Sequence, residues 1–304
     1  MTDTNKAIRI FIYIAVFSAC HLLTTSCDNN THKESVPAVA VSIEPMRNIL
    51  EHIAGGNYDI ITVLERGDNP ETFEPSMQKR VAVDRCKAYF TIGAFAFEDA
   101  FGKSSGNLKI FDTADGVKRI YGTHNHSLHD GHHHTDDNVA SMESTADPHV
   151  WTSLRNAKII AANMANGLAQ IDPDNADIYQ SNLKRYYHHI DSIDDIVTHR
   201  FDSLGSKRSF AVWHPSLSYF ARDYGLRQIA VGQESKEVSP RKMREIIDHA
   251  VADSVHVFFY QREFDSRQAQ SISERIGSRL VEIDPLAYDW ETQINLITDG
   301  IMYQ

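Results

Sequence analysis

Four residues able to bind a metal ion lie close behind predicted strands or at the start of a following helix. They are Glu71, His149, His214 and Asp284. Imidazole and carboxylate groups are the usual nitrogen and oxygen ligands of zinc, and carboxylates also suit manganese. Ligands of an open parallel sheet bind at the carboxyl ends of its strands. Two of the four residues come from each half of the chain, so the pattern predicts one metal site in a cleft between two lobes.

Each of these residues alone has a simpler interpretation. A histidine at the end of a strand is often a hydrogen-bonded loop residue, and Asp284-Pro285 is a common start of a turn. Other carboxylates in the same neighbourhoods are alternative ligands: Asp68, Glu74 and Glu263. It is the joint pattern of the four residues that favours metal binding.

A second group of histidines is crowded between residues 124 and 134. It contains six of the sixteen histidines: His124, His126, His129, His132, His133 and His134. An acidic run follows as far as Ala146, and we interpret 121–146 as an insert without regular structure. The insert either collects metal weakly, as a secondary site that supplies the cleft, or is a solvated loop with adventitious chelation only.

The composition limits the classes of protein to consider. The 304 residues are 42% hydrophobic and 23% charged, which is typical of a globular chain long enough for two domains. A net charge of −11 argues against nucleic acid as a partner. Only Cys86 follows the first 27 residues, which excludes an internal disulfide and a cysteine zinc site. The sequence contains no HExxH, Gly-x-Ser-x-Gly or phosphate-binding glycine motif, so we predict no enzymatic activity.

Residues 1–27 are predicted to be a leader. Lys6 and Arg9 precede an apolar stretch that is too short to span a membrane. Small residues before Cys27 resemble a bacterial lipoprotein cleavage site, with Cys20 as the alternative and ordinary secretion as the simpler reading. Residues 28–36 would then be a tether. We expect a periplasmic protein that is attached to the membrane only by a lipid on Cys27.

Strand and helix patterns alternate through the rest of the chain, which predicts an α/β fold with parallel sheets. One lobe is expected over 37–173 and a second over 205–304. Between them, 174–204 is the linking segment, in which a helical pattern with one apolar stripe runs from Asp174 to about Phe201 and would form a rigid helix of about 40 Å. The predicted strands are Val36–Ile43, Tyr58–Leu64, Ala88–Ile92, Leu108–Phe111, Phe210–Trp213, Leu226–Ala230, Val255–Tyr260 and Leu280–Ile283.

Over 37–304 the sequence resembles the metal-binding solute-binding proteins of bacterial ABC transporters, in the zinc and manganese uptake family. The most specific match is Asp147-Pro148-His149-Val150-Trp151. Other matching motifs belong to the opening strand and helix, at 42–46 and 55–56, and to the remaining three ligands, at 69–76, at 218–220 and 224–226 behind His214, and at 284–286. A histidine-rich insert before the second ligand is typical of the zinc-uptake branch.

The resemblance implies that the four residues bind Zn²⁺ for delivery to a permease in the inner membrane, with the protein acting as a monomer. Two departures stand out. Glu71 occupies the position of the family's usual histidine, and Pro215 follows His214. With two histidines and two carboxylates the preference moves toward Mn²⁺, whereas the histidine insert favours Zn²⁺, which we choose.

The resemblance also implies a mechanism. Metal enters the cleft, the lobes close slightly, and the permease opens the cleft again. Binding should weaken in mild acid, because histidine must be neutral to ligate. Four protein ligands would leave no place for a substrate water, which argues for a carrier. A secreted metallohydrolase and a surface adhesin are the alternative classes.

Overall fold

The computed structural model describes residues 36–102, 108–121, 146–205, 208–232, 239–262 and 266–303. From Val36 onward the chain forms one compact unit. None of the helices within these ranges combines the length and apolar character that crossing a bilayer requires. The predicted leader, the lipidation site at Cys27 and the six crowded histidines lie outside the described residues.

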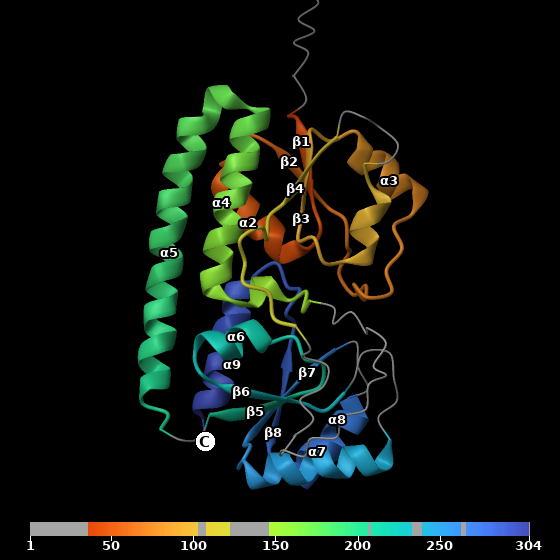
Figure 1. The fold of residues 1–304 in the computed structure, drawn as a ribbon, viewed down its shortest axis with the longest axis vertical. Coiled ribbons are helices and arrows are strands. Elements are labelled where there is room, and N and C mark those ends of the chain that lie inside the picture. The colour runs from red at the N-terminus through yellow and green to blue at the C-terminus, as the bar shows by residue number, and fades with distance from the viewer. Residues whose placement is uncertain are drawn as a thin grey trace, which may run out of the picture. The chain divides into compact units, whose positions relative to one another are not determined.

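The first lobe is built on a parallel sheet with the strand order β2-β1-β3-β4 (Figure 1). Val39 pairs with Ile60 on one side of β1, and Ala40 with Tyr89 on the other. The elements of this lobe are β1 (Ala38–Val41), α2 (Glu44–Ala54), β2 (Asp59–Thr62), α3 (Met77–Asp84), β3 (Ala88–Thr91), the 3-10 helix η1 (Ala96–Ala100), β4 (Lys109–Asp112), the 3-10 helix η3 (Val150–Thr152) and α4 (Leu154–Ile171).

The second lobe repeats this arrangement with the strand order β6-β5-β7-β8, again parallel. Four of the five residues of β7 are buried, as expected for a central strand covered on both faces. Its elements are β5 (Ser209–Val212), α6 (Ser218–Asp223), β6 (Arg227–Ala230), α7 (Pro240–Ala252), β7 (Val257–Gln261), α8 (Ser266–Ile276), β8 (Arg279–Ile283) and α9 (Trp290–Met302).

One long helix links the lobes, as predicted. After a short 3-10 turn, η4 (Pro173–Asn175), helix α5 runs from Ala176 to Asp202 and lies beside α4 (Figure 1). Its 27 residues correspond to about 40 Å. Asn182 donates a 2.8 Å hydrogen bond from Nδ2 to the Ile53 carbonyl near the end of α2. A side chain at the following Gly55 would meet that amide at 2.9 Å, which explains the glycine there.

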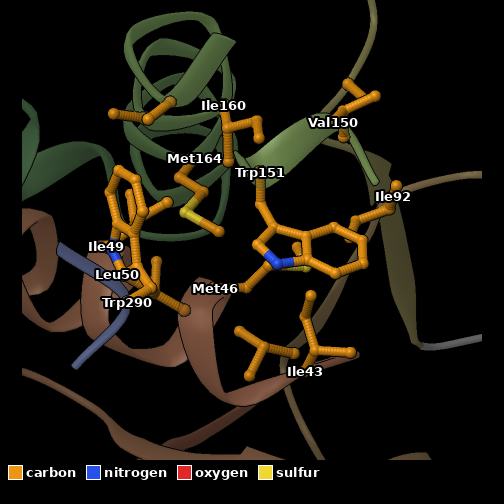
Figure 2. Close-up of a cluster of buried hydrophobic side chains, with 14 of the residues drawn as sticks. Ile43, Met46, Ile49, Leu50, Ile92, Val150, Trp151, Ile160, Met164 and Trp290 are labelled. Atoms are coloured by element: carbon orange, nitrogen blue, oxygen red, sulfur yellow. The ribbon is translucent and has the colours of Figure 1, made fainter. Parts of the chain in front are cut away.

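The two lobes share a hydrophobic core. Trp290 at the start of α9 lies against Ile49 and Leu50 of α2, and Trp151 packs nearby (Figure 2). Both indoles are almost fully buried, with 2% and 1% of their surface exposed. Separating the lobes widely would expose this shared apolar surface, at roughly 25 cal/mol per Å². Small relative movements are therefore favoured.

The sequence predictions of fold class, parallel sheets and long helix are confirmed. All eight predicted strands are present, and their bounds differ from the predictions by at most two residues. The predicted helix near Pro215 begins at Ser218 instead, after a turn in which Ser216 N–H donates to the His214 carbonyl. The short helix η1 was not predicted.

Candidate metal site

His149 lies just before η3 and is held by Asp147. One carboxylate oxygen of Asp147 accepts from the backbone N–H of His149 at 2.9 Å and contacts ring Nδ1 at 2.8 Å. Both residues are buried, with 5% and 1% of their surface exposed. Burial alone would raise the pKa of Asp147, but the hydrogen bonds and charge of His149, together with Ser218, keep it below its usual value. An ionised carboxylate only accepts, so Nδ1 donates to it, and in the neutral ring this tautomer leaves a lone pair on Nε2.

His214 follows β5 in the second lobe and faces His149. The two Nε2 atoms are 3.1 Å apart, and the rings meet edge to face with centroids 4.9 Å apart. Nε2 of His214 also lies 3.6 Å from Oε1 of Glu71. Two ligands of a tetrahedral zinc ion are about 3.3 Å apart, given zinc–nitrogen bonds of ~2.0–2.1 Å. The His214 imidazole therefore lies at ligand spacing from His149 and slightly farther from Glu71.

Glu71 is presented by a loop with internal hydrogen bonds. The Asn69 side chain accepts from the Glu71 N–H at 2.9 Å, and the Asn69 carbonyl accepts from Thr72 N–H at 3.2 Å. Phe73 packs edge to face on Phe97, with ring centroids 5.3 Å apart. The Glu71 side chain itself is 24% exposed. Its backbone is therefore fixed while its carboxylate stays within reach of solvent.

Asp284 follows β8 and lines a cleft of about 610 Å³. Its Oδ1 accepts from Leu286 N–H at 3.1 Å, and its own N–H donates to Gln293 at 2.9 Å. The cleft is lined by residues of both lobes, and its carboxylates are Glu44, Glu65, Asp68, Glu282 and Asp284. Asp68, one of the alternative ligands, lies in this cleft with Asp284. Glu263 lies outside the described residues.

The structure thus brings Glu71, His149 and His214 together and places Asp284 on a cleft wall. In the part of the chain that the structure describes, no three His, Cys, Asp or Glu side chains are arranged closely enough to hold a metal ion as they stand. Coordination by all four would need side-chain adjustment. The hydrogen bonds of Asp284 among the described residues are with its own loop and with Gln293.

Trp151 links this site to the second lobe, a role that sequence reasoning missed. Its ring centroid lies 5.3 Å from that of His149, and Nε1 donates to the Pro285 carbonyl at 2.8 Å. Phe95 lies against its other side, 5.9 Å between centroids. The only signal in the sequence was its position two residues after His149.

Glu98 of η1 was also missed, and it holds the loop that carries Phe95. Its carboxylate accepts from the N–H groups of Ile92, Ala94 and Phe95 at 2.8, 3.1 and 3.2 Å, and from the Ser42 hydroxyl. Burial raises the pKa of Glu98 despite these four donors. Phe95 stacks on Phe97, so Glu98 supports an aromatic layer beneath both ligand loops of the first lobe.

Two parallel α/β lobes, joined by one long helix and with metal-capable residues behind their strands, define a metal-binding solute-binding protein of an ABC transporter. Residues 39–298 match the family model for the zinc-uptake complex component A, periplasmic. The match covers most of the chain, and the chain belongs to this family. The family is a transport component and not a class of enzymes.

Relatives are similar over most of this chain. A putative metal-binding protein of Treponema pallidum (strain Nichols) is 24% identical over 273 residues, covering 87% of this chain and 83% of that protein. The high-affinity zinc uptake system protein ZnuA of Bacillus subtilis (strain 168) is 22% identical, covering 89% and 87%. The zinc-binding lipoprotein AdcA of Streptococcus pneumoniae (strain ATCC BAA-255 / R6) is 21% identical, covering 90% of this chain but 55% of AdcA.

Solved structures share the fold. A crystal structure of ZnuA superposes with a TM-score of 0.76 at 29% identity, covering 88% of this chain and 98% of that one. The manganese-bound periplasmic metal binding protein of Candidatus Liberibacter asiaticus superposes with a TM-score of 0.72, covering 87% and 99%. The latter is 20% identical and supports the fold alone.

Proposed function

We propose that this protein binds Zn²⁺ between its lobes and delivers it to the permease of an ABC transporter. The metal is cargo, held by Glu71 and His149 from the first lobe and His214 and Asp284 from the second. The observation that supports this most directly is the 3.1 Å approach of the two Nε2 atoms from opposite lobes. The zinc-uptake family model supports the same metal.

The residues have distinct roles in this proposal. Asp147 keeps the lone pair of His149 directed at His214, so two nitrogen ligands are oriented before metal arrives. Two carboxylates would balance the charge of a divalent ion, which lowers the cost of burying it. Four protein ligands would make a closed carrier site without a catalytic water. We propose that the lobes over 37–173 and 205–304 move slightly against α5 to complete and release this site.

Mn²⁺ is the second candidate cargo. It is favoured by Glu71, because replacing an imidazole by a carboxylate moves a site toward harder metals. Glu71→His should therefore raise the ratio of zinc to manganese affinity, measured by competitive titration of the two metals on the purified protein. An unchanged ratio would show that Glu71 does not set the preference.

Location and partners follow from the family and from the leader. We propose a periplasmic or cell-surface protein that is anchored through Cys27 and docks as a monomer on the permease. Labelling with a radioactive fatty acid, with Cys27→Ala and Cys20→Ala as the two variants, tests the anchor. Lipid on neither cysteine would mean that the leader is simply removed.

The zinc site itself is tested by removing its histidines. His149→Ala and His214→Ala, in a protein lacking 122–145, should each weaken zinc binding by orders of magnitude in chelator competition. His199→Ala, on the exposed side of α5, is the control and should bind zinc normally. Unchanged binding in the first two variants would refute the site. Zinc uptake during starvation by the deletion protein separates the two readings of the histidine insert.

A further inference from the structure

Tyr219 of helix α6 reaches from the second lobe to two backbone groups of the first. The side chain is fully buried. Its hydroxyl donates to the Asp147 carbonyl at 2.7 Å and accepts from the Ile120 N–H at 3.2 Å. One phenol thus satisfies two backbone groups that lie in different stretches of the first lobe.

Ile120 and Asp147 are themselves paired. The Asp147 N–H donates to the Ile120 carbonyl at 2.8 Å, and the next residues outward, Tyr121 and Ala146, form an antiparallel bridge. We call these four residues the neck. Tyr219 closes the inner end of the neck, so the position of Asp147 depends on a hydroxyl group of the opposite lobe.

Asp147 connects this contact to the proposed metal site. Its carbonyl oxygen is held by Tyr219, and its carboxylate holds both the backbone N–H and the ring of His149. The carbonyl and carboxylate belong to one residue with Pro148 on its C-terminal side, which restricts the backbone further. A shift of the Asp147 carbonyl therefore moves the carboxylate that orients His149.

The rest of α6 is attached to the first lobe in the same way. Arg222 donates to the Lys118 carbonyl at 3.0 Å, and Asp223 accepts from the Ser153 hydroxyl that caps α4. Helix α6 begins four residues after His214. The segment that carries His214 and the segment that carries His149 are therefore held against one another through α6.

We propose that Tyr219 is a positioning residue of the metal site, which keeps Asp147, and through it His149, in the orientation that retains the metal. It makes no contact with the metal in this proposal. Its loss should speed metal release, because a loosened ligand leaves more readily, and should alter the geometry of coordination. This inference rests on the proposed function, since it assumes that His149 is a ligand.

Tyr219→Phe tests the inference, with Tyr224→Phe as the matched control. Tyr224 ends the same helix and is also buried, and its hydroxyl donates to Asp194 of α5 at 2.6 Å, away from the ligand loops. Each change removes one buried hydroxyl, so both variants should lose thermal stability. Only Tyr219→Phe should release zinc faster to a chelator, by about tenfold, the low end of effects for outer partners of a ligand.

A spectrum separates positioning from general destabilisation. Cobalt(II) bound to the wild-type protein and to Tyr224→Phe should give the same visible absorption bands, and Tyr219→Phe should give shifted ones. Equal release rates and equal spectra in both variants would overturn the inference. The proposed function would survive that result, because it fails only if His149→Ala leaves zinc binding unchanged.

A measurement on the wild-type protein covers the case in which Tyr219→Phe does not fold. If the neck and the metal site are coupled, zinc must stabilise the hydrogen bond from Ile120 N–H to Tyr219 by the same free energy that this bond contributes to zinc binding. Hydrogen exchange at the Ile120 amide should therefore slow on zinc loading. Exchange at the same rate with and without zinc would overturn the inference.

Discussion

The two buried tryptophans of the shared core differ in what their indole N–H groups meet. Trp151 of the first lobe donates to the Pro285 carbonyl, whereas Nε1 of Trp290 in the second lobe meets no acceptor among the described residues. Both side chains are labelled in Figure 2. Trp151 comes two residues after a proposed ligand, and Trp290 comes after the loop that carries Asp284. Of the two indoles, only that of Trp151 makes a polar contact within the described residues, and this contact joins the two lobes.

The proposed ligands show the same difference. His149 is buried and held by a carboxylate, an indole and, through Asp147, the Tyr219 hydroxyl of the opposite lobe. Asp284 lines a cleft, and among the described residues its own N–H bonds to Gln293 and its Oδ1 to Leu286. The difference suggests a division of labour in which the first lobe presents a fixed ligand and the second an adjustable one.

The largest effect is expected from a substitution that removes the support of His149, the fixed ligand of the proposed site. Asp147→Ala removes the acceptor of the His149 ring, and outer partners of metal ligands typically contribute 10–100-fold to affinity, so zinc affinity should fall by about that factor. Gln293→Ala removes only the acceptor for the Asp284 N–H and should cost much less. Chelator competition on both purified variants gives the two affinities. Equal losses of zinc affinity in the two variants would mean that His149 and Asp284 are held equally firmly.

A smaller effect is expected when the stabilities of two tryptophan variants are compared. Trp151→Phe and Trp290→Phe remove the same atoms from the same core, but only the first leaves a carbonyl without its donor. Leaving a buried polar group unpaired costs about 1–3 kcal/mol, so Trp151→Phe should be destabilised more than Trp290→Phe by about that amount. Urea unfolding of the metal-free variants measures the difference. A larger loss for Trp290→Phe would contradict the comparison.

The smallest effect concerns a repeated serine contact. Ser42, just after β1, bonds to buried Glu98, and Ser216, after the equivalent strand β5, bonds to the Gln261 amide at 2.9 Å. Burial raises the pKa of Glu98, so the folded protein binds this proton more tightly than the unfolded chain does. Stability should therefore fall as pH rises from the ordinary glutamate range through the raised pKa.

Exchanging the two partners tests this point. In Glu98→Gln, the unfolding free energy should fall less as pH rises than it does in the wild-type protein. In Gln261→Glu it should fall more, because a second buried carboxyl is added in the second lobe. The unfolding free energy of each variant is compared with wild type from pH 4 to pH 8. If Glu98→Gln keeps the full slope of the wild-type protein, Glu98 is not its source.

Local patterns in the sequence were enough for most of the fold. Strands such as Val257–Gln261 are apolar runs, and Ser239-Pro240 predicted the start of α7, where the Ser239 hydroxyl accepts from Lys242 N–H. Helix η1 has a local signal in Glu98, which accepts from the Ala94 and Phe95 N–H groups, but the Ser42 hydroxyl that completes this contact is distant in sequence. No local pattern reports such a contact.

The sequence likewise predicted the candidate ligands of the site but not the residues that support them. Glu71 and His214 after strands, and His149 before a helix, were predicted to form one site, and His214 lies 3.1 Å from His149 and 3.6 Å from Glu71. That these three residues bind a metal is a prediction. That Asp284 belongs with them is still a prediction. The roles of Tyr219 and Trp151 were not predicted, because each side chain donates to a backbone carbonyl of the other lobe. Every residue has such a carbonyl, so the residue types in a sequence do not show which one is the acceptor.

The neck has a consequence for how the protein can change over evolution or by engineering. Its two ends are joined by the pairing of Ile120 with Asp147 and of Tyr121 with Ala146, whatever runs between them. Doubling the length of a flexible loop with joined ends costs only about 0.6 kcal/mol. We therefore expect that residues, or a whole reporter domain, can be gained or lost between 122 and 145 while the segment from Asp147 to His149 keeps its geometry.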